Sequence, residues 1–430
     1  MKVVFVVLLA LLLAVPLVFF MMGSHSGLAL DHPPSVIGAE TAFHVTVRNP
    51  HGISQLTASL EQDGKTQSIT AAAFKKHRLG VFRHEAEQNY TVAVGKKNFP
   101  AIHDGAAKVT FTATSNDLRG RSDSVTFPVT VNLAPPRVSA DGEQHYLNTG
   151  GSELVTFTPG GYVTESGVKV GKYTFTSFPM ANGTRRFSLF AYPWDLDASV
   201  VPYVYAANAA GGQARATFTY KLFPKKFRSR DFELSDALME KLVNQIDPNG
   251  TGDLLSRFLK INGEMRRANN QTLADLRKQT ADHFLFTEPF YQVVPAVEAQ
   301  FADVRTYLYH GKKVDQQVHL GFDLADKSHM VIPAANDGKV VFADLLGIYG
   351  NCIVIDHGAG LQSIYGHMSE FSVKKGYLVK RGQQIGHSGQ TGMAGGDHLH
   401  YSMQVDGVQV NPVEWWDAHW LQDRIWSKLK

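Results

Sequence analysis

The sequence has 430 residues, of which 44% are hydrophobic and 19% are charged, as is typical of folded globular proteins. A chain of this length usually divides into more than one domain. The formal net charge of +3 is too small to favour nucleic acid as a partner, so we expect no nucleic-acid binding.

The first predicted element is an apolar run from Val3 to Met22, which follows Lys2 and is interrupted only by Pro16. About 20 apolar residues can cross a bilayer as a helix, whereas the apolar core of a cleaved signal peptide has roughly 7–15. We predict an uncleaved transmembrane anchor, with the N-terminus inside and the rest of the chain exported. A cleaved signal peptide is the alternative.

Residues 31–223 alternate between apolar and polar side chains over short stretches such as Ala42–Val47, with turn residues between the stretches. This pattern predicts β-sandwich domains. The segment Leu133–Pro136 contains two prolines and marks the predicted boundary between two of them. Similar strand-to-turn endings at 111–120 and 204–211 indicate two related immunoglobulin-like domains, which could be spacers or binding modules.

A helical segment is predicted next, after a basic run at 223–230 that we interpret as a solvated linker. Ser235 is a candidate cap for a first helix and Asp253 for a second, each followed by apolar residues at helical spacing. We expect a third helix from Thr272 to His283. The helices could pack on the sandwiches or cover a functional site.

The loop between the first two predicted helices, Asp247–Asp253, superficially resembles an EF-hand loop. The twelfth position of such a loop supplies a bidentate glutamate, but here it is Phe258. We therefore interpret the loop as a turn that links two helices.

The single cysteine and the C-terminal tryptophans are both expected to pack in a hydrophobic core. The single cysteine, Cys352, lies in an apolar stretch and has no partner for an internal disulfide, so we expect it in the core. Four tryptophans lie in the last sixteen residues, where they are expected to seal a hydrophobic face with a terminal helix; stacking on sugar rings is the alternative.

Metal-capable side chains recur between His319 and His400. His319 and Asp323 are four positions apart, and His398 and His400 follow after a series of predicted strands with glycine turns. Residues two apart in a strand lie on the same face, so His398 and His400 are expected to address one site. Three protein ligands and an open position are typical of catalytic zinc, and His319, Asp323 and one of the late pair supply such a set.

The order and spacing of these motifs resemble a lysostaphin/LytM-type zinc metallopeptidase domain over roughly residues 290–420, and the tail from Asn411 to Lys430 resembles that of membrane-anchored members. The motifs are His319-x-Gly321-x-Asp323, Pro333-Ala334-Ala335-Asn336-Asp337-Gly338, Asp356-His357-Gly358, Tyr365-Gly366-His367, Gly382-Gln383-Gln384-Ile385-Gly386, Thr391-Gly392, His398-Leu399-His400 and Val410-Asn411-Pro412.

The resemblance implies that His319, Asp323 and His400 bind Zn²⁺. It also implies that His367 and His398 act as general base and as stabiliser of the oxyanion during attack on a peptide carbonyl.

Two positions depart from the family pattern. Asp397 stands where many members have proline, and Ala302 where many have glycine. Asp397 is expected to alter the rim of the cleft, but neither residue is a ligand.

The family's usual substrate is the peptide part of bacterial peptidoglycan. We therefore predict a zinc metalloendopeptidase, a peptidoglycan hydrolase of the bacterial cell envelope, anchored in the inner membrane with its bulk in the periplasm, with a regulatory protein as a possible further partner. Two alternatives remain: a catalytically silent module that activates another wall hydrolase, and an exported general metalloprotease.

The predicted fold is mainly β and multidomain. Its expected parts are a transmembrane segment at 1–26, β-sandwich domains at 27–134 and 135–224, a helical connector at 225–288 and a β-rich catalytic domain with a C-terminal helix at 289–430.

Overall fold

The computed structural model describes residues 23–76, 84–181, 183–293 and 296–430. The chain forms two compact units. The first comprises Met1–Arg137, Gly160–Glu165 and Ala206–Ala214, and the second comprises Val138–Pro159, Ser166–Tyr205 and Arg215–Lys430. The predicted transmembrane segment at Val3–Met22 lies outside the described residues. Within the described part of the chain, no helix is long and apolar enough to cross a membrane.

The N-terminal unit is built from two mainly antiparallel sheets with one core between them. The sequence of strand β3 explains this arrangement. Its residues alternate between buried and exposed, so the sheet has one apolar face that must be covered. One sheet has the order β1-β3-β6 and the other β2-β8-β7-β4-β5, in which the short β2 pairs in parallel with β8. The strands are β1 Gly27–Leu30, β2 Val36–Ile37, β3 Thr41–Arg48, β4 Ile53–Gln62, β5 Lys65–Ala73, β6 Gln88–Val94, β7 Gly105–Ser115 and β8 Ser122–Val131.

Ten further strands follow, and the mainly β character predicted for this half of the chain is confirmed. They form sheets with the orders β14-β15-β11-β9, β13-β12-β16-β17 and β10-β18. The strands are β9 Arg137–Ala140, β10 His145–Asn148, β11 Ser152–Gly160, β12 Glu165–Val170, β13 Tyr173–Thr176, β14 Phe178–Pro179, β15 Arg186–Ala191, β16 Tyr203–Ala207, β17 Gln213–Ala216 and β18 Tyr220–Phe223. An immunoglobulin-like relationship between the two strand-rich regions stays a prediction.

The C-terminal unit is organised around an eight-stranded sheet with the order β20-β23-β31-β27-β26-β25-β29, to which β32 adds beside β31. Two three-stranded sheets flank it, β19-β21-β22 and β24-β30-β28. The strands are β19 Ser229–Glu233, β20 Val297–Ala299, β21 Asp303–Tyr309, β22 Lys312–His319, β23 Phe322–Leu324, β24 Val331–Pro333, β25 Gly338–Leu345, β26 Asn351–Asp356, β27 Leu361–Met368, β28 Glu370–Phe371, β29 Leu378–Val379, β30 Gln384–His387, β31 Leu399–Val405 and β32 Val408–Val410.

Both faces of the large sheet are buried. In β26, Cys352 and Val354 belong to the cluster under the helical segment, whereas Ile353 and Ile355 belong to the opposite cluster. This alternation follows from the two-residue period of a strand. Cys352 is fully buried, so its predicted place in the core is confirmed.

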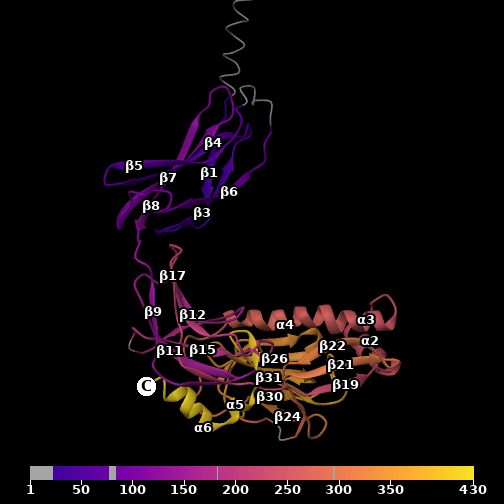
Figure 1. Ribbon diagram of the computed structural model, residues 1–430. Coiled ribbons are helices and arrows are strands. Elements are labelled where there is room, and N and C mark those ends of the chain that lie inside the picture. The colour runs from indigo at the N-terminus through magenta and orange to yellow at the C-terminus, as the bar shows by residue number, and fades with distance from the viewer. Residues whose placement is uncertain (1–22, 77–83, 182, 294–295) are drawn as a thin grey trace, which may run out of the picture. The chain divides into compact units, whose positions relative to one another are not determined.

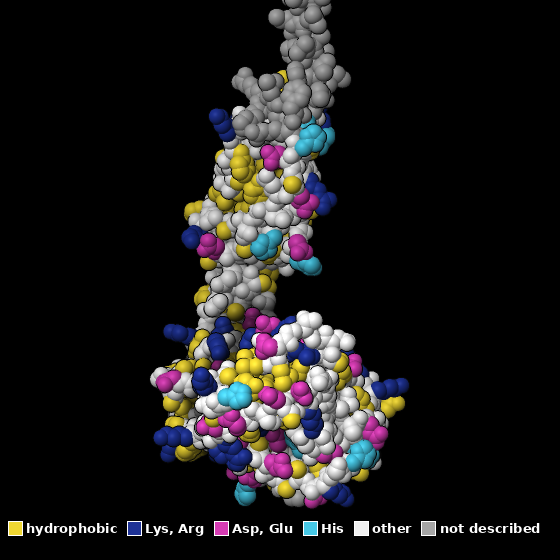
Figure 2. All heavy atoms as spheres, turned by 90° about the vertical axis from the view of Figure 1, so that its right-hand side faces the viewer, with side chains coloured by type: hydrophobic (Ala, Val, Ile, Leu, Met, Phe, Trp, Pro, Cys, Tyr) yellow, Lys and Arg dark blue, Asp and Glu magenta, His cyan; other side chains and the backbone are white. Residues whose placement is uncertain are grey.

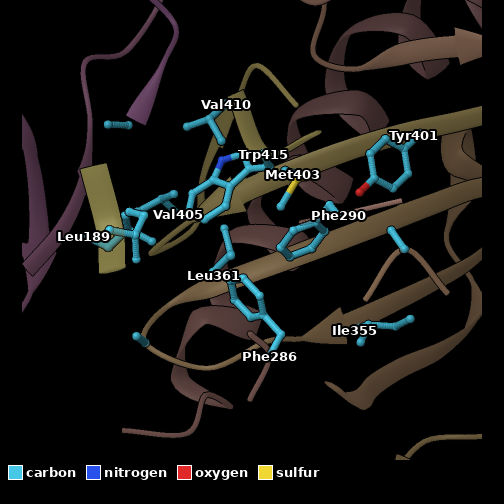
Figure 3. Close-up of a cluster of buried hydrophobic side chains, with 14 of the residues drawn as sticks. Leu189, Phe286, Phe290, Ile355, Leu361, Tyr401, Met403, Val405, Val410 and Trp415 are labelled. Carbon is cyan, nitrogen blue, oxygen red and sulfur yellow. The ribbon is translucent and has the colours of Figure 1, made fainter. Parts of the chain in front are cut away.

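The opposite cluster continues into the strands that precede the large sheet. Leu189 of β15 lies beside Val405 of β31, close to Trp415 and Phe290 (Figure 3). The strands after Val138 therefore share a core with the C-terminal sheet. This arrangement differs from the predicted separate domain at 135–224, because the apolar face of these strands is covered by the large sheet.

The helical segment lies along one side of the strands, and the C-terminal helices α5 and α6 lie on the other (Figure 1). Its parts are α2 Asp236–Ile246, α3 Leu254–Lys260, a π-helical turn at Ile261–Met265, α4 Arg266–Asp275 and a 3₁₀ turn at Leu276–Lys278. The C-terminal helices are α5 Val413–Trp416 and α6 Ala418–Leu421, followed by a π-helical turn at Gln422–Trp426.

The predicted helix caps are confirmed, but the third predicted helix is misplaced. Ser235 Oγ accepts from the Leu238 N–H, and Asp253 Oδ1 accepts from the Ser256 N–H. The helix expected at 272–283 instead spans Arg266–Asp275, and Thr272 lies within it rather than at its start, with its hydroxyl donating to the carbonyl oxygen of Ala268.

The basic run at 223–230 is solvated in part, because Lys225, Lys226 and Arg230 are exposed, but Arg228 has a buried partner. The Arg228 guanidinium forms an ion pair with Asp303, whose side chain is buried. The chain then enters β19, which pairs in parallel with β21 beside the large sheet. The region predicted as a helical connector at 225–288 is therefore part of the C-terminal unit.

The C-terminal tryptophans pack as predicted. Trp415 is fully buried, and Trp416, Trp420 and Trp426 are partly buried against the same core. Figure 2 shows basic and acidic side chains interspersed over the visible face of the C-terminal unit, in keeping with the small net charge.

His357 gives the C-terminal unit a predicted dependence on pH. Its Nδ1 donates to the carbonyl oxygen of Asp337 at 2.7 Å, and its Nε2 lies 2.8 Å from the hydroxyl of Ser363. Burial lowers the pKa of this imidazole to about 4. Its contribution to stability is therefore complete above about pH 6.5 and is lost as the pH falls towards 4, by about 3 kcal/mol.

We expect His357→Gln to lose less stability than wild type on acidification from pH 7 to pH 4.5. The free energy of unfolding can be followed by tryptophan fluorescence, because all five tryptophans lie in the C-terminal unit. An equal loss of stability in both proteins would contradict this assignment.

Candidate metal centre and cleft

Three side chains from different elements converge beside the large sheet. His319 ends β22, and Asp323 of β23 pairs directly with His400 of β31. His319 Nε2 lies 2.9 Å from Asp323 Oδ1 and 3.0 Å from His400 Nδ1, and the last two atoms are 3.2 Å apart. Strand register thus places three donor atoms, far apart in the sequence, at the corners of one small triangle.

The donor set fits a zinc ion. Donor atoms about 2.0 Å from a tetrahedral centre are separated by about 3.3 Å, close to the edges of this triangle. His319 Nδ1 lies 3.1 Å from the carbonyl oxygen of Gln300, which accepts its proton and leaves Nε2 with a free lone pair. Two imidazoles and one carboxylate are a donor set that zinc accepts.

The electrostatics of the triangle favour ligation. Burial opposes ionisation of Asp323, but the charge of His319 and hydrogen bonds from His319, His398 and His400 outweigh it and hold the pKa of Asp323 well below its usual value. Burial lowers the pKa of His400 to about 4. At neutral pH the carboxylate is charged and His400 is neutral, as metal ligands must be.

His367 and His398 lie beside the triangle. Their rings are 4.8 Å apart, and His398 Nε2 is 3.5 Å from Asp323 Oδ1. His398 and His400 thus both face Asp323, as their two-residue spacing predicts. Nδ1 of His367 donates to the carbonyl oxygen of Thr391 at 2.8 Å. The Nε2 atom of His367 therefore remains available to a ligand in the cleft, which His367 lines.

The environments of these two imidazoles differ. Burial, with the neighbouring histidines, holds the pKa of His367 well below its ordinary value. Burial also lowers the pKa of His398, but the hydrogen bond and charge of Asp323 outweigh this effect and raise it. His367 has a φ of 62°, a left-handed conformation uncommon for residues other than glycine.

The five histidine and aspartate residues singled out from the sequence are therefore brought together. They line a cleft of about 250 Å³. The sequence did not indicate Arg305, whose Nη2 lies 2.6 Å from Asp323 Oδ2. A buried carboxylate needs a cationic partner, but the sequence does not show which arginine supplies it.

The helical segment also contributes to this cleft, which answers the question that the sequence left open. Arg266 and Asn270 of α4 line the wall beside Tyr349. The Tyr349 hydroxyl donates to Asn270 Oδ1 at 2.8 Å. From α2, Lys241 donates to the carbonyl oxygen of Gly395 at 2.9 Å. These helices hold the loops that border the metal-capable residues.

The two departures from the family pattern both lie near the site. Ala302 has a φ of 62°, where glycine is favoured, and its N–H donates to the carbonyl oxygen of His319 at 2.7 Å. Asp397 accepts from the N–H of His329 at 3.1 Å and from the hydroxyl of Ser388 at 2.5 Å. Asp397, the residue before His398, thus links this part of the chain to the segments of His329 and Ser388.

Gly321 is required by the close approach of His400. A Cβ at Gly321 would lie 2.6 Å from His400 Cε1 and 2.8 Å from the carbonyl oxygen of Tyr401. We expect Gly321→Ala to displace the imidazole, lower the free energy of unfolding by about 1–3 kcal/mol and weaken zinc binding at least about tenfold. Denaturation and zinc titration measure the two effects.

Gly142→Ala is the matched control, because a Cβ there meets no atom within 4 Å. Zinc binding of Gly321→Ala equal to that of this control would contradict the role given to Gly321.

Comparison with known proteins agrees with this geometry. The model of peptidase family M23 matches residues 317–412. DD-carboxypeptidase/endopeptidase Mpg of Neisseria meningitidis is 34% identical over 123 residues, which are 29% of this chain and 28% of that protein. Peptidoglycan DD-endopeptidase ShyA of Vibrio cholerae is 42% identical over 96 residues, 22% of each chain. Stage II sporulation protein Q of Bacillus subtilis is 33% identical over 132 residues, 30% of this chain and 45% of that protein.

The C-terminal part of the chain thus contains a domain of the M23 type. Residues 317–412 match the model of peptidase family M23, and the resemblance predicted from the motifs is confirmed for this domain. The chain spans less than a third of the length of the first two relatives and less than half of the third.

Proposed function

We propose that this chain is a zinc-dependent endopeptidase that hydrolyses peptide bonds in bacterial peptidoglycan. The observation that carries the proposal is the convergence of His319 Nε2, Asp323 Oδ1 and His400 Nδ1 within 3.2 Å of one another, with two further histidines at the edge of the same cleft. The matches to peptidoglycan endopeptidases support the substrate class.

In this proposal His319, Asp323 and His400 hold the metal. Zn²⁺ bound by them would polarise the scissile carbonyl and lower the pKa of water in the cleft. Arg305 keeps the Asp323 carboxylate oriented through Oδ2, so that Oδ1 faces the two imidazoles. The carbonyl oxygen of Gln300 fixes the ring of His319 in the same way.

His367 and His398 divide the proton transfer and the stabilisation of the oxyanion. Both have Nδ1 hydrogen-bonded to a backbone carbonyl oxygen, of Thr391 and of Gly396 respectively, so Nε2 is the reacting atom in each. One Nε2 accepts the proton of the attacking water, and the other, when protonated, donates to the developing negative charge.

The basic residues of the cleft support a substrate that carries carboxylates, as the stem peptides of peptidoglycan do. Arg230, Arg266 and Arg305 all line the cleft, with Glu298 as an opposing charge. Arg305 is engaged by Asp323, and Arg266 donates to Asn262. Arg230 lies on the exposed strand β19, from which its guanidinium could reach a substrate carboxylate.

We expect Arg230→Gln to raise KM for peptidoglycan fragments about 2- to 5-fold with little change in kcat, because exposed charge pairs contribute up to about 1 kcal/mol. Steady-state kinetics on soluble fragments measure this effect. Arg277→Gln, at an exposed position outside the cleft, is the control. An unchanged KM for Arg230→Gln would show that Arg230 does not contact the substrate.

We further propose that the chain acts in the cell envelope, held at the inner membrane by the apolar segment Val3–Met22 with its bulk in the periplasm. That segment supports the anchor through its length and composition. A regulatory protein partner is compatible with this location, where a wall hydrolase must be controlled.

Purified peptidoglycan and casein, each incubated with the zinc-loaded protein, separate the proposal from its alternatives. New amino termini from peptidoglycan but not from casein are the expected result. Cleavage of casein at a comparable rate would indicate a general metalloprotease, and cleavage of neither would indicate a silent regulatory module.

A further inference from the structure

A second group of metal-capable side chains lies on the three-stranded sheet β24-β30-β28. His387 on the central strand pairs directly with Glu370 of β28 on one side and with Val331 of β24 on the other. His329 precedes Val331 by two residues. The sheet therefore brings two imidazoles and a carboxylate together from three separate segments of the chain.

Their donor atoms lie close enough together to form a candidate donor set. The rings of His329 and His387 are stacked, with centroids 4.5 Å apart and planes inclined by 6°. One donor atom of each of the three residues lies within 4.8 Å of the others. His387 Nδ1 is 2.7 Å from Glu370 Oε1, but the contact lacks the alignment of a hydrogen bond. Among the described residues this buried nitrogen thus has no hydrogen-bond partner, although a carboxylate oxygen faces it.

We propose that His329, Glu370 and His387 bind a divalent transition-metal ion of the zinc class, at a site distinct from the triangle of His319, Asp323 and His400. Two imidazole nitrogens and one carboxylate oxygen suit zinc and its neighbours better than calcium or magnesium. His329 and Glu370 are exposed, so water would complete the coordination, and we expect weaker binding than at the buried triangle.

This second site is coupled to the cleft through Asp397. The N–H of His329 and the hydroxyl of Ser328 both donate to Asp397 Oδ2, and the hydroxyl of Ser388, next to His387, donates to Asp397 Oδ1. Asp397 immediately precedes His398. An ion bound at the second site would therefore restrain the segments of His329 and Ser388, which hydrogen-bond to Asp397 beside His398.

Zinc titration of the metal-free full chain, followed by calorimetry, tests the proposal without reference to activity. Wild type is expected to bind two equivalents, the second more weakly. Glu370→Gln and His387→Gln are expected to weaken the second equivalent at least about tenfold and to leave the first unchanged. The second equivalent should also raise the Tm of wild type, and this increment should be absent from both variants.

His283→Gln is the matched control, because His283 is exposed and lies 2.8 Å from Asp282 Oδ1 but belongs to no group of three donors among the described residues. It should bind both equivalents as wild type does. A single equivalent in wild type, or a second equivalent that Glu370→Gln and His387→Gln leave unaltered, would overturn the proposal.

Discussion

Asp323→Asn is expected to abolish zinc retention and to lower the endopeptidase rate at least about 10²-fold. Asp323 is the one anionic corner of the triangle, and its Oδ1 lies 2.9 Å and 3.2 Å from the donor nitrogens of His319 and His400. Asparagine keeps the size of the side chain but removes the charge that balances the metal. It also leaves the guanidinium of Arg305 without its anionic partner.

Zinc content after dialysis and the release of new amino termini from peptidoglycan measure the two effects of Asp323→Asn. Asp326→Asn is a matched control, because Asp326 lies three residues away and is exposed. Retention of zinc and activity by Asp323→Asn would show that the ion is bound elsewhere.

The second large effect is expected from His398→Ala, which should keep its zinc but lose about 10²- to 10⁴-fold in rate. The three proposed ligand atoms do not include an atom of His398, whose Nε2 lies 3.5 Å from Asp323 Oδ1 at the edge of the triangle. In the proposed mechanism, removing this imidazole takes away a group that moves or holds a proton beside the scissile bond. The donor atoms remain in place.

His419→Ala provides the control for His398→Ala, because His419 is almost fully exposed on α6. Both proteins should contain equal amounts of zinc, and the control should cleave at the wild-type rate. Loss of zinc from His398→Ala would make His398 a ligand, and an unchanged rate would remove it from the mechanism.

Most of the candidate site could be predicted from the sequence because strand geometry carries information about side-chain direction. The two-residue spacing of His398 and His400 places both on one face, and the pairing of Asp323 with His400 completes the triangle. Arg305 could not be predicted in this way. Its contact with Asp323 depends on the register of β21 beside β22, which no local pattern specifies.

The fold was predictable to a similar extent. Alternating patterns correctly indicated the strand-rich first half, and the caps at Ser235 and Asp253 correctly indicated two helices. The sequence did not show that the strands after Val138 share a core with the large sheet. A pattern of apolar residues indicates that one face of a strand is buried, but it does not indicate which part of the chain covers that face. Nor did it show that Arg228 would pair with a buried Asp303.

The central claim is tested most directly by zinc content and product analysis of the same preparations, wild type and His400→Ala, incubated with purified peptidoglycan. Wild type should retain zinc through dialysis and release new amino termini, and both properties should be lost in His400→Ala. Zinc-loaded wild type that releases no new termini, or His400→Ala that cleaves at the wild-type rate, would contradict the assignment of this site as a zinc-dependent endopeptidase.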